Sequence, residues 1–223
     1  MSPKAADPAV RTALLENAAR LVATEGSAGL TLRRLAETTG TSTMAIYTHF
    51  GGMQYLRDEV RREGFARLRI HLENVEPTSD PVADLARLGH EYHANARENP
   101  HLYRAMFMDP AQPDDDIGVD TFGLLVECVA RCLAAGRFEP SDATTTALQL
   151  WSGAHGVVAL ELSGLLEEDL ALVTLESSWR NLCLAFGDDR ARLDRSLAKA
   201  RRAAGVTPPD SPSLGRYDAR RKS

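Results

Sequence analysis

Several features that mark common protein classes are scarce in this chain of 223 residues. It has three cysteines, Cys128, Cys132 and Cys183, and so sparse and odd a set does not form the disulfide framework of a small secreted domain. No apolar run approaches the roughly 18–20 residues that span a bilayer. The first ten residues lack the apolar core of a signal peptide. We therefore expect a cytoplasmic protein with no membrane partner.

Aromatic residues are also few. They make up 6% of the chain, and extended β-branched runs are scarce, which disfavours a large sheet. The hydrophobic residues, 43% of the total, are mostly Leu, Ala and Val and recur at spacings of three and four. The sequence therefore predicts an all-α fold of about nine to ten helices. We expect them at about 8–25, 32–38, 43–49, 54–72, 81–98, 100–108, 117–135, 141–163, 168–186 and 188–203.

The segment 30–56 is the most informative part of the chain. It predicts a short helix capped by Thr31, a turn at Gly40, a second short helix capped by Ser42, and the start of a third helix. The helical period turns one set of apolar side chains inward, namely Leu32, Leu35, Ala36, Ala45, Ile46 and Phe50. Two short helices joined by a glycine turn are typical of a helix-turn-helix, which offers its second helix to the DNA major groove.

The outward face of the second short helix would then read bases. Threonine can hydrogen-bond a base edge or touch a thymine methyl group, whereas Met44 offers only apolar contact. Tyr47 and His49 can donate to phosphate oxygens, and Arg33 and Arg34 can add charge-assisted contacts. Tyr47 could instead be a packing residue, and His49 could pack or cap. The DNA-binding candidates are Thr31, Arg33, Arg34, Thr41, Ser42, Thr43, Met44, Tyr47, Thr48 and His49.

The charge distribution agrees with this reading. The formal net charge is −5, which by itself does not suit a DNA-binding protein. Residues 1–62, however, carry eight Lys and Arg against six Asp and Glu, a net +2, and the remainder carries −7. A mildly basic N-terminal part on an acidic body presents one face to phosphates.

The residues of this segment resemble a known family. Gly40-Thr41-Ser42-x-x-Ala45-Ile46-Tyr47-x-His49-Phe50, preceded by Leu30-Thr31-Leu32-Arg33-x-Leu35-Ala36, is similar to the N-terminal domain of the TetR (tetracycline-repressor-like) family. The resemblance implies that Thr31 and Tyr47 contact phosphates and that positions 41–44, 47 and 48 line the groove. Two positions depart from the family pattern, because Gly52-Met53 replaces a usual serine-lysine pair and Thr43 replaces a residue that is often basic.

The C-terminal part carries a second resemblance. Trp151-Ser152-Gly153-Ala154-His155-Gly156 and the stretch 93–107 are similar to a Trp-His-Gly class of C-terminal domain in this family. That likeness implies a helical regulatory domain with an internal pocket, and a dimer face on the helices expected at 141–163 and 168–186. Both helices have more apolar surface than one buried face needs, which also suggests a partner surface. Candidates for binding an effector are Tyr92, Tyr103, Met106, Phe107, Phe122, Trp151 and His155, although aromatic and Met side chains at helical spacing are also typical of a plain core.

Other chemistry is not supported. His90 and His93 share one helix face, but no third ligand for a metal is identifiable. Cys128 and Cys132 lie one turn apart and are read as small buried residues. No phosphate-binding loop, nucleophile elbow or catalytic carboxylate pair is present. We therefore expect no metal, no cofactor and no enzymatic activity.

Together these observations predict a homodimeric regulator with a DNA-binding domain at 1–52, a ligand-binding and dimerisation domain at 53–204 and a disordered tail at 205–223. The expected partners are a double-stranded, palindromic DNA operator, a second copy of the chain and a small apolar or amphipathic effector. Repression, relieved by the effector, is the expected mode of action. The alternative is a helical small-molecule-binding protein or enzyme that keeps the fold without specific DNA binding.

Overall fold

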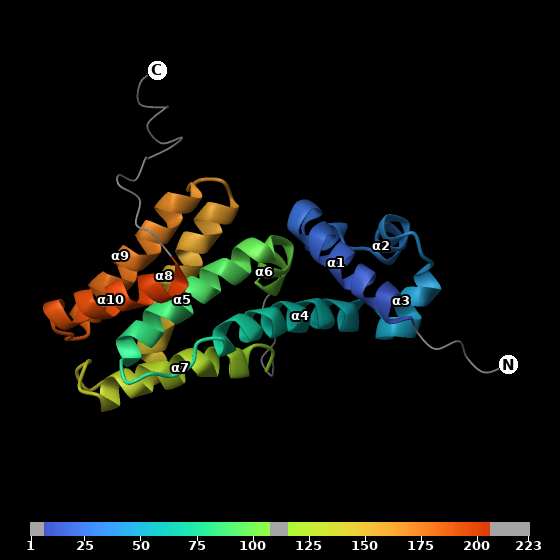
Figure 1. Ribbon diagram of the computed structural model, residues 1–223. Coiled ribbons are helices and arrows are strands. Elements are labelled where there is room, and N and C mark those ends of the chain that lie inside the picture. Colours follow the sequence, from blue (N-terminus) through green and yellow to red (C-terminus); the bar gives the residue numbers. More distant parts are fainter. Residues whose placement is uncertain (1–6, 108–115, 206–223) are drawn as a thin grey trace, which may run out of the picture. The chain divides into compact units, whose positions relative to one another are not determined.

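The computed structural model describes residues 7–107 and 116–205. Within these ranges it contains ten α-helices and no strand, which confirms the predicted all-α fold (Figure 1). The helices are α1 (Pro8–Glu25), α2 (Leu32–Thr39), α3 (Thr43–Phe50), α4 (Met53–Glu73), α5 (Pro81–Glu98), α6 (Pro100–Met106), α7 (Val119–Ala134), α8 (Ala143–Leu162), α9 (Glu168–Ala185) and α10 (Arg190–Ala204). No helix among these residues is long and apolar enough to cross a membrane. All of the predicted tail except Gly205 lies outside the described residues.

The predicted caps set the ends of the two short helices. The Thr31 hydroxyl accepts a hydrogen bond from the backbone N–H of Arg34 at 3.2 Å, and the Ser42 hydroxyl accepts one from Ala45 at 3.2 Å. Such caps satisfy backbone donors that a helix start leaves unpaired. Gly40 adopts φ 68° and ψ 32°, a left-handed conformation that ends α2 and suits glycine. The helix-turn-helix therefore forms where the sequence predicted it.

Three helix starts were predicted two residues too early, and one of them is that of α7, which begins at Val119 rather than at 117. Helix α10 begins at Arg190 rather than at Asp188, because Asp189 is its N-cap and accepts from the backbone of Arg192 at 2.8 Å. Asp188 is buried instead and forms an ion pair with Arg137, which lies between α7 and α8. Helix α8 likewise begins at Ala143 and not at 141, since Asp142 caps it.

The chain folds into two compact units. The first contains residues 1–69 and 98–119, and the second contains residues 70–97 and 120–223. This is a structural division, distinct from the functional domains that the sequence predicted. Helix α6 belongs to the first unit because it packs along α1, and Leu102 and Ala105 share one hydrophobic cluster with α1, α2 and α3. Helix α4 runs without interruption from one unit into the other.

The second unit is a bundle of α5 and α7 to α10. Helices α8 and α9 pack side by side as a pair joined by a short connection (Figure 1). Trp179 of α9 is buried against α5 at Gly89, where an added Cβ would lie only 2.9 Å from the indole ring. Glycine at this position therefore permits a close approach of the two helices.

Candidate functional site

The helix α3 is held by a small apolar core. Ile46 is fully buried, Phe50 is 7% exposed, and both pack in the same cluster as Leu35 of α2 and Leu14 of α1. These side chains occupy one side of α3 and fix its orientation relative to α1 and α2. The opposite side of α3 is thereby presented to solvent by a rigid support.

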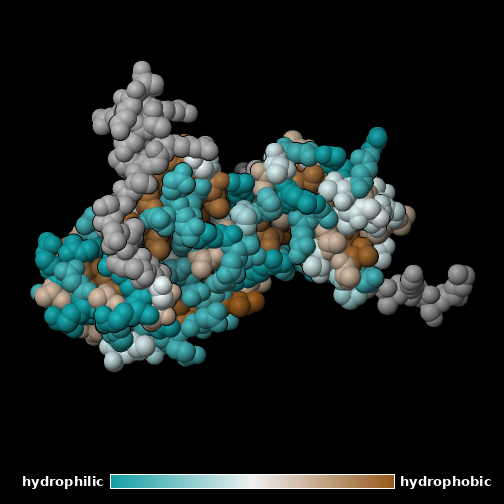
Figure 2. All heavy atoms as spheres, turned by 45° about the horizontal axis from the view of Figure 1, so that its top comes forward, coloured by the Kyte–Doolittle hydropathy of each residue, from teal (hydrophilic) through white to brown (hydrophobic). Residues whose placement is uncertain are grey.

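That exposed side carries the residues that the sequence predicted to read DNA. Met44 is 69% exposed and Tyr47 is 49% exposed, and Thr43 and Thr48 are exposed beside them. In Figure 2 the spheres over α2 and α3, at the right of the view, are mainly pale or brown with few strongly hydrophilic ones. From Gly40 to Phe50 there is no Lys, Arg, Asp, Glu, Asn or Gln. The face is therefore exposed, uncharged and rich in hydroxyl and methyl groups.

Some of the hydroxyl groups on this face already have partners. The Ser42 oxygen accepts from the backbone of Ala45, as its capping role requires. The Thr48 hydroxyl donates to the backbone carbonyl of Met44 at 2.9 Å. Thr31, a predicted phosphate contact, caps α2 in the same way. The hydroxyl hydrogen of Thr48 is thus committed to its own helix, and its methyl group remains.

The arginines next to this face are engaged with carboxylates. The Nε of Arg33 lies 2.9 Å from Glu37, and the Nη2 of Arg34 lies 3.0 Å from Glu25. Both guanidinium groups are largely exposed, so water screens these pairs strongly. They can be exchanged for phosphate contacts at little cost.

Three further residues next to the predicted DNA-reading face have partners within the first unit. Arg57 of α4 donates to the carbonyl oxygen of Ser27 at 2.7 Å, which ties α4 to the 3₁₀ turn at Ser27–Gly29. Met53, which stands where the family usually has lysine, packs against the apolar core of the first unit. The His49 ring is half-buried and lies 6.1 Å from the Phe50 ring. At position 53 the chain therefore gains apolar packing in place of a positive charge.

Four of the predicted effector residues come together in the second unit. The Trp151 Nε1–H donates to the Tyr92 hydroxyl at 3.2 Å, and that hydroxyl lies 3.4 Å from Nδ1 of His155. The Phe122 ring packs 5.9 Å from the Trp151 ring. Burial lowers the pKa of His155, which favours the neutral imidazole. Nδ1 of a neutral His155 can accept a hydrogen bond from the Tyr92 hydroxyl, so the three polar groups form one directed chain of hydrogen bonds.

The other three effector candidates lie in the first unit. Tyr103 and Phe107 form an edge-to-face pair with centroids 5.3 Å apart, and Phe65 stacks on Phe107 at 5.9 Å. Met106 is buried against α4, where an added Cβ on Gly64 would lie 2.4 Å from its side chain. These three residues therefore belong to the packing between α4 and α6.

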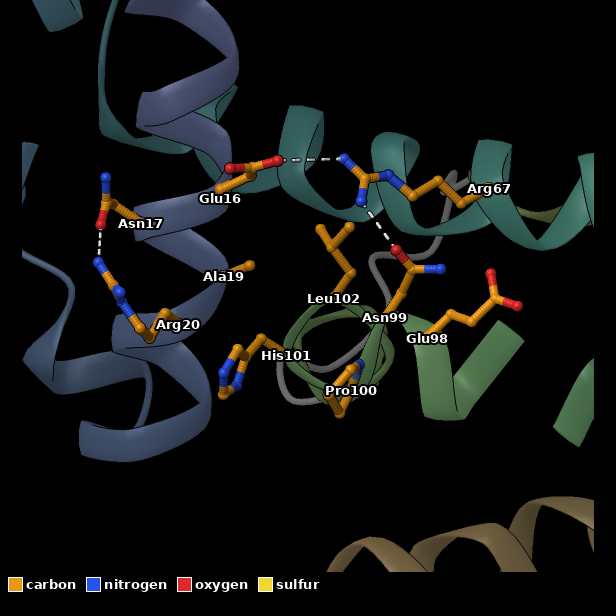
Figure 3. Close-up of a pocket in the computed structure, with 10 residues that line it drawn as sticks. All are labelled: Glu16, Asn17, Ala19, Arg20, Arg67, Glu98, Asn99, Pro100, His101 and Leu102. Carbon is orange, nitrogen blue, oxygen red and sulfur yellow. Dashed lines mark hydrogen bonds and ion pairs between the residues drawn. The ribbon is translucent and has the colours of Figure 1, made fainter. Parts of the chain in front are cut away.

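A polar cavity of about 380 Å³ lies among α1, α4 and α6 of the first unit (Figure 3). Arg67 points into it, donates to the Asn99 side chain at 2.8 Å and lies 3.7 Å from Glu16. His101 also lines it, and burial, together with Arg104 and Arg20, lowers the pKa of this histidine. None of the predicted effector residues lines the cavity. Its charged walls differ from those of an apolar effector pocket.

The side chains of His90 and His93 contact different helices. His90 Nε2 lies 2.9 Å from Glu176 of α9, and His93 Nε2 lies 2.6 Å from Glu161 of α8. Sequence reasoning missed both glutamates, because each pair joins residues far apart in the chain and leaves no local pattern. These pairs are buried links from α5 to the α8–α9 pair.

Two family models match the chain. One, described as "Bacterial regulatory proteins, tetR family", matches residues 14–60. The other, described as "Tetracyclin repressor-like, C-terminal domain", matches residues 85–186. Both models describe parts of one kind of protein and occur here in that order. The first match contains α2 and α3, and the second contains Tyr92, Trp151 and His155.

Individual relatives agree with the family models. An uncharacterized HTH-type transcriptional regulator of Mycobacterium tuberculosis is 28% identical over 162 residues, which cover 71% of this chain and 72% of that protein. A solved protein of unknown function from Rhodococcus sp. RHA1 is 27% identical with a TM-score of 0.68, over 84% of this chain and all of that one. The TetR family protein CprB from S. coelicolor A3(2) is 16% identical with a TM-score of 0.69, over 89% and 98% of the two chains, and shares the fold.

Proposed function

Because the chain belongs to the tetR family of bacterial regulatory proteins, it is a ligand-responsive, DNA-binding transcriptional regulator, and we propose that it is a repressor that binds a palindromic operator as a homodimer. The observation that carries the proposal is the exposed, uncharged face of α3 on a buried three-helix core. Such a helix fits the major groove, and a two-fold dimer would place two copies on two half-sites. A regulator of the chromosome would work in the cytoplasm.

In the proposed complex, contacts to phosphate fix the register of α3. Tyr47 is exposed at the middle of α3 and can donate its hydroxyl hydrogen to a phosphate oxygen. Arg33 and Arg34 can exchange their exposed carboxylate partners for phosphates. The backbone N–H groups at the starts of α2 and α3 can add further contacts.

A gel-shift and footprint on DNA around the protein's own gene tests DNA binding. Tyr47→Phe removes one hydrogen bond to a charged group in each subunit, so the affinity should fall by about tenfold or more. The melting temperature and the dimer should persist, because half of the Tyr47 side chain is already in solvent. Ile70→Ala, an exposed position on α4 outside the helix-turn-helix, is the control and should bind normally.

Two results would contradict this part of the proposal. If Tyr47→Phe or Tyr47→Ala unfolds the protein, Tyr47 is a core residue. If the wild-type protein protects no specific sequence even at low salt, the alternative of a helical small-molecule-binding protein or enzyme is favoured.

We propose that α8 and α9 form the dimer interface. The exposed residues of α8 from Ala143 to Leu160 include no charged side chain, and Leu148 and Leu160 are 43% and 44% exposed. Gly156 lies on this exposed side, and an added Cβ would meet nothing within 4 Å in the same chain. Glycine inside a helix costs about 1 kcal/mol relative to alanine, so a partner backbone at this position would account for its presence.

Analytical ultracentrifugation tests the interface. Gly156→Leu should leave the chain folded, since its surroundings are open, and should shift the protein toward monomer because the new side chain separates the two subunits. Ala130→Leu adds the same side chain at an exposed position on α7 and should leave the dimer intact. An unaltered dimer in Gly156→Leu would place the interface elsewhere.

The cluster of Tyr92, Phe122, Trp151 and His155 is our proposed effector-binding site. It offers aromatic surface and one directed hydrogen-bond chain, which suits an apolar or amphipathic small molecule. An effector releases the operator only if it binds more tightly to the conformation that does not fit DNA. Helix α4 runs through both compact units and is the proposed lever.

The amphipathic dye anilinonaphthalene sulfonate serves as a probe of this cluster. Trp151→Phe keeps the aromatic surface and removes the N–H that orients Tyr92. The dye should therefore bind the variant with a changed affinity, and its fluorescence should still depend on the protein being folded. Tyr103→Phe, in the first unit, should not alter dye binding. An equal effect of both substitutions would argue against the cluster as the site.

A further inference from the structure

The recognition helix lacks the side chains that read most bases. Bidentate readout of guanine uses Arg or Lys, that of adenine uses Asn or Gln, and cytosine is read by Asp or Glu. None of these residue types occurs between Gly40 and Phe50. Direct readout by this segment is therefore restricted to hydroxyl groups, the imidazole of His49 and apolar contacts.

The hydroxyl groups are further restricted by the structure. Ser42 uses its oxygen to cap α3, and Thr48 uses its hydroxyl hydrogen on the Met44 carbonyl. The groups that remain at the start of the exposed face are Thr41, Thr43 and the side chain of Met44. Among the residues that the structure describes, Met44 is the most exposed large apolar side chain, at 69%.

The position of Met44 in α3 determines which contacts its exposed side chain can make. Single exposed apolar residues are ordinary on protein surfaces. Met44, however, is the second residue of α3, and the N-terminal residues of a recognition helix are those that reach base edges. In the major groove, the apolar group that a base edge offers is the C5-methyl group of thymine. Thr48 lies one helical turn further along the same face, with its methyl group left free by its internal hydrogen bond.

We infer that Met44 reads the C5-methyl group of a thymine in each operator half-site, with the methyl group of Thr48 as a second apolar contact. This inference rests on the proposed DNA-binding function and adds to it the chemical identity of the base. The half-site should therefore contain A·T pairs where the start of α3 enters the groove. Any bidentate readout of a guanine in the half-site would come from residues outside α3.

Selection of bound sequences from random double-stranded DNA, followed by single-position substitution, tests the inference. Each thymine of the selected half-site is replaced by uracil, which removes only the C5-methyl group. At one position the wild-type protein should bind about threefold to fivefold more weakly, the loss expected from one buried methyl group. Met44→Ala should bind the thymine operator more weakly and should show no further loss with uracil at that position. Tyr47→Phe, which alters a phosphate contact, should retain the full uracil effect.

Each other outcome has a defined meaning. If uracil is tolerated at every position, or if Met44→Ala still loses affinity with uracil, the inference is overturned while the regulator function stands. A selected half-site with an invariant G·C pair under Met44 would overturn it as well. If no sequence is selected, the proposed function fails, and this inference fails with it.

Discussion

A buried arginine in the second unit should be among the most sensitive positions of this protein. Arg137, between α7 and α8, is 5% exposed and forms two hydrogen bonds of 2.7 Å with the carboxylate of Asp188. The same guanidinium contacts Asp80 at 3.1 Å and Ser196 at 3.2 Å. It thereby joins the start of α5, the connection before α8 and the helix α10.

The expected loss follows from the burial of Asp188. The Asp188 side chain is only 1% exposed, so Arg137→Met would leave its carboxylate in the protein interior without its cation. Removing one partner of a buried ion pair destabilises a protein by about 3–5 kcal/mol. Asp80 would lose less, because it is partly exposed and keeps two contacts of 2.9 Å from Ser196. A loss of this size is a large part of the roughly 5–15 kcal/mol that stabilises a typical domain.

Urea unfolding followed by tryptophan fluorescence measures this loss in the relevant unit. Both tryptophans, Trp151 and Trp179, belong to the second unit, so the signal reports its unfolding. The double variant Arg137→Met/Asp188→Asn should recover much of the lost stability, since no unpaired charge remains buried. Arg180→Met, which breaks an exposed pair with Asp194, should leave the midpoint nearly unchanged.

The reasoning about Arg137 is refuted by either of two results. The first is a loss below about 1 kcal/mol in Arg137→Met, the range of an exposed pair. The second is a double variant that is no more stable than the single one. Either result would mean that solvent reaches the Asp188 carboxylate, contrary to its burial.

Two further predictions concern the same unit. Gly89→Ala should destabilise the second unit by about 1–3 kcal/mol and shift Trp179 fluorescence, because the new Cβ would lie 2.9 Å from the indole. At Gly123 an added Cβ meets open space, so Gly123→Ala should be neutral or stabilising in the same assay. Burial opposes ionisation of Glu176, but hydrogen bonds from His90 and Arg201 outweigh it and lower the pKa of this carboxyl. The ionised Glu176 therefore stabilises the fold above the ordinary pKa of 4.5, and this stabilisation is lost as the pH falls. Glu176→Gln should flatten the acid side of the profile of stability against pH, measured by urea unfolding.

Local features of this fold could be predicted from the sequence. Helix ends depend on nearby residues, such as the Thr31 and Ser42 hydroxyls and the left-handed Gly40. The inward set of the helix-turn-helix follows from the helical period, and Leu35 and Ile46 are indeed fully buried. The exposed α3 face was therefore predictable as the complement of that set.

Contacts between distant parts of the chain could not be predicted in this way. Nothing near Arg137 in the sequence indicates that Asp188, 51 residues later, will be its partner. The same holds for His93 with Glu161, 68 residues later, since the sequence shows only that His93 shares a helix face with His90. Met53 was predicted as the loss of a charge, and its packing against the core depends on how α4 meets α1 and α2.

The composition of α3 also bears on how release of the operator could work. In the proposed complex, α3 would contribute specificity but little electrostatic affinity, because its exposed face carries no Lys or Arg. That affinity would be left to exposed arginines such as Arg33 and Arg34. Both of these are already paired with carboxylates, so exchange for phosphate yields only a modest gain. A coupling of about 1–3 kcal/mol between effector and operator changes affinity by roughly 5–150-fold. Release of the proposed operator by an effector would therefore require coupling toward the upper end of that range, unless the protein concentration lies close to its Kd for the operator.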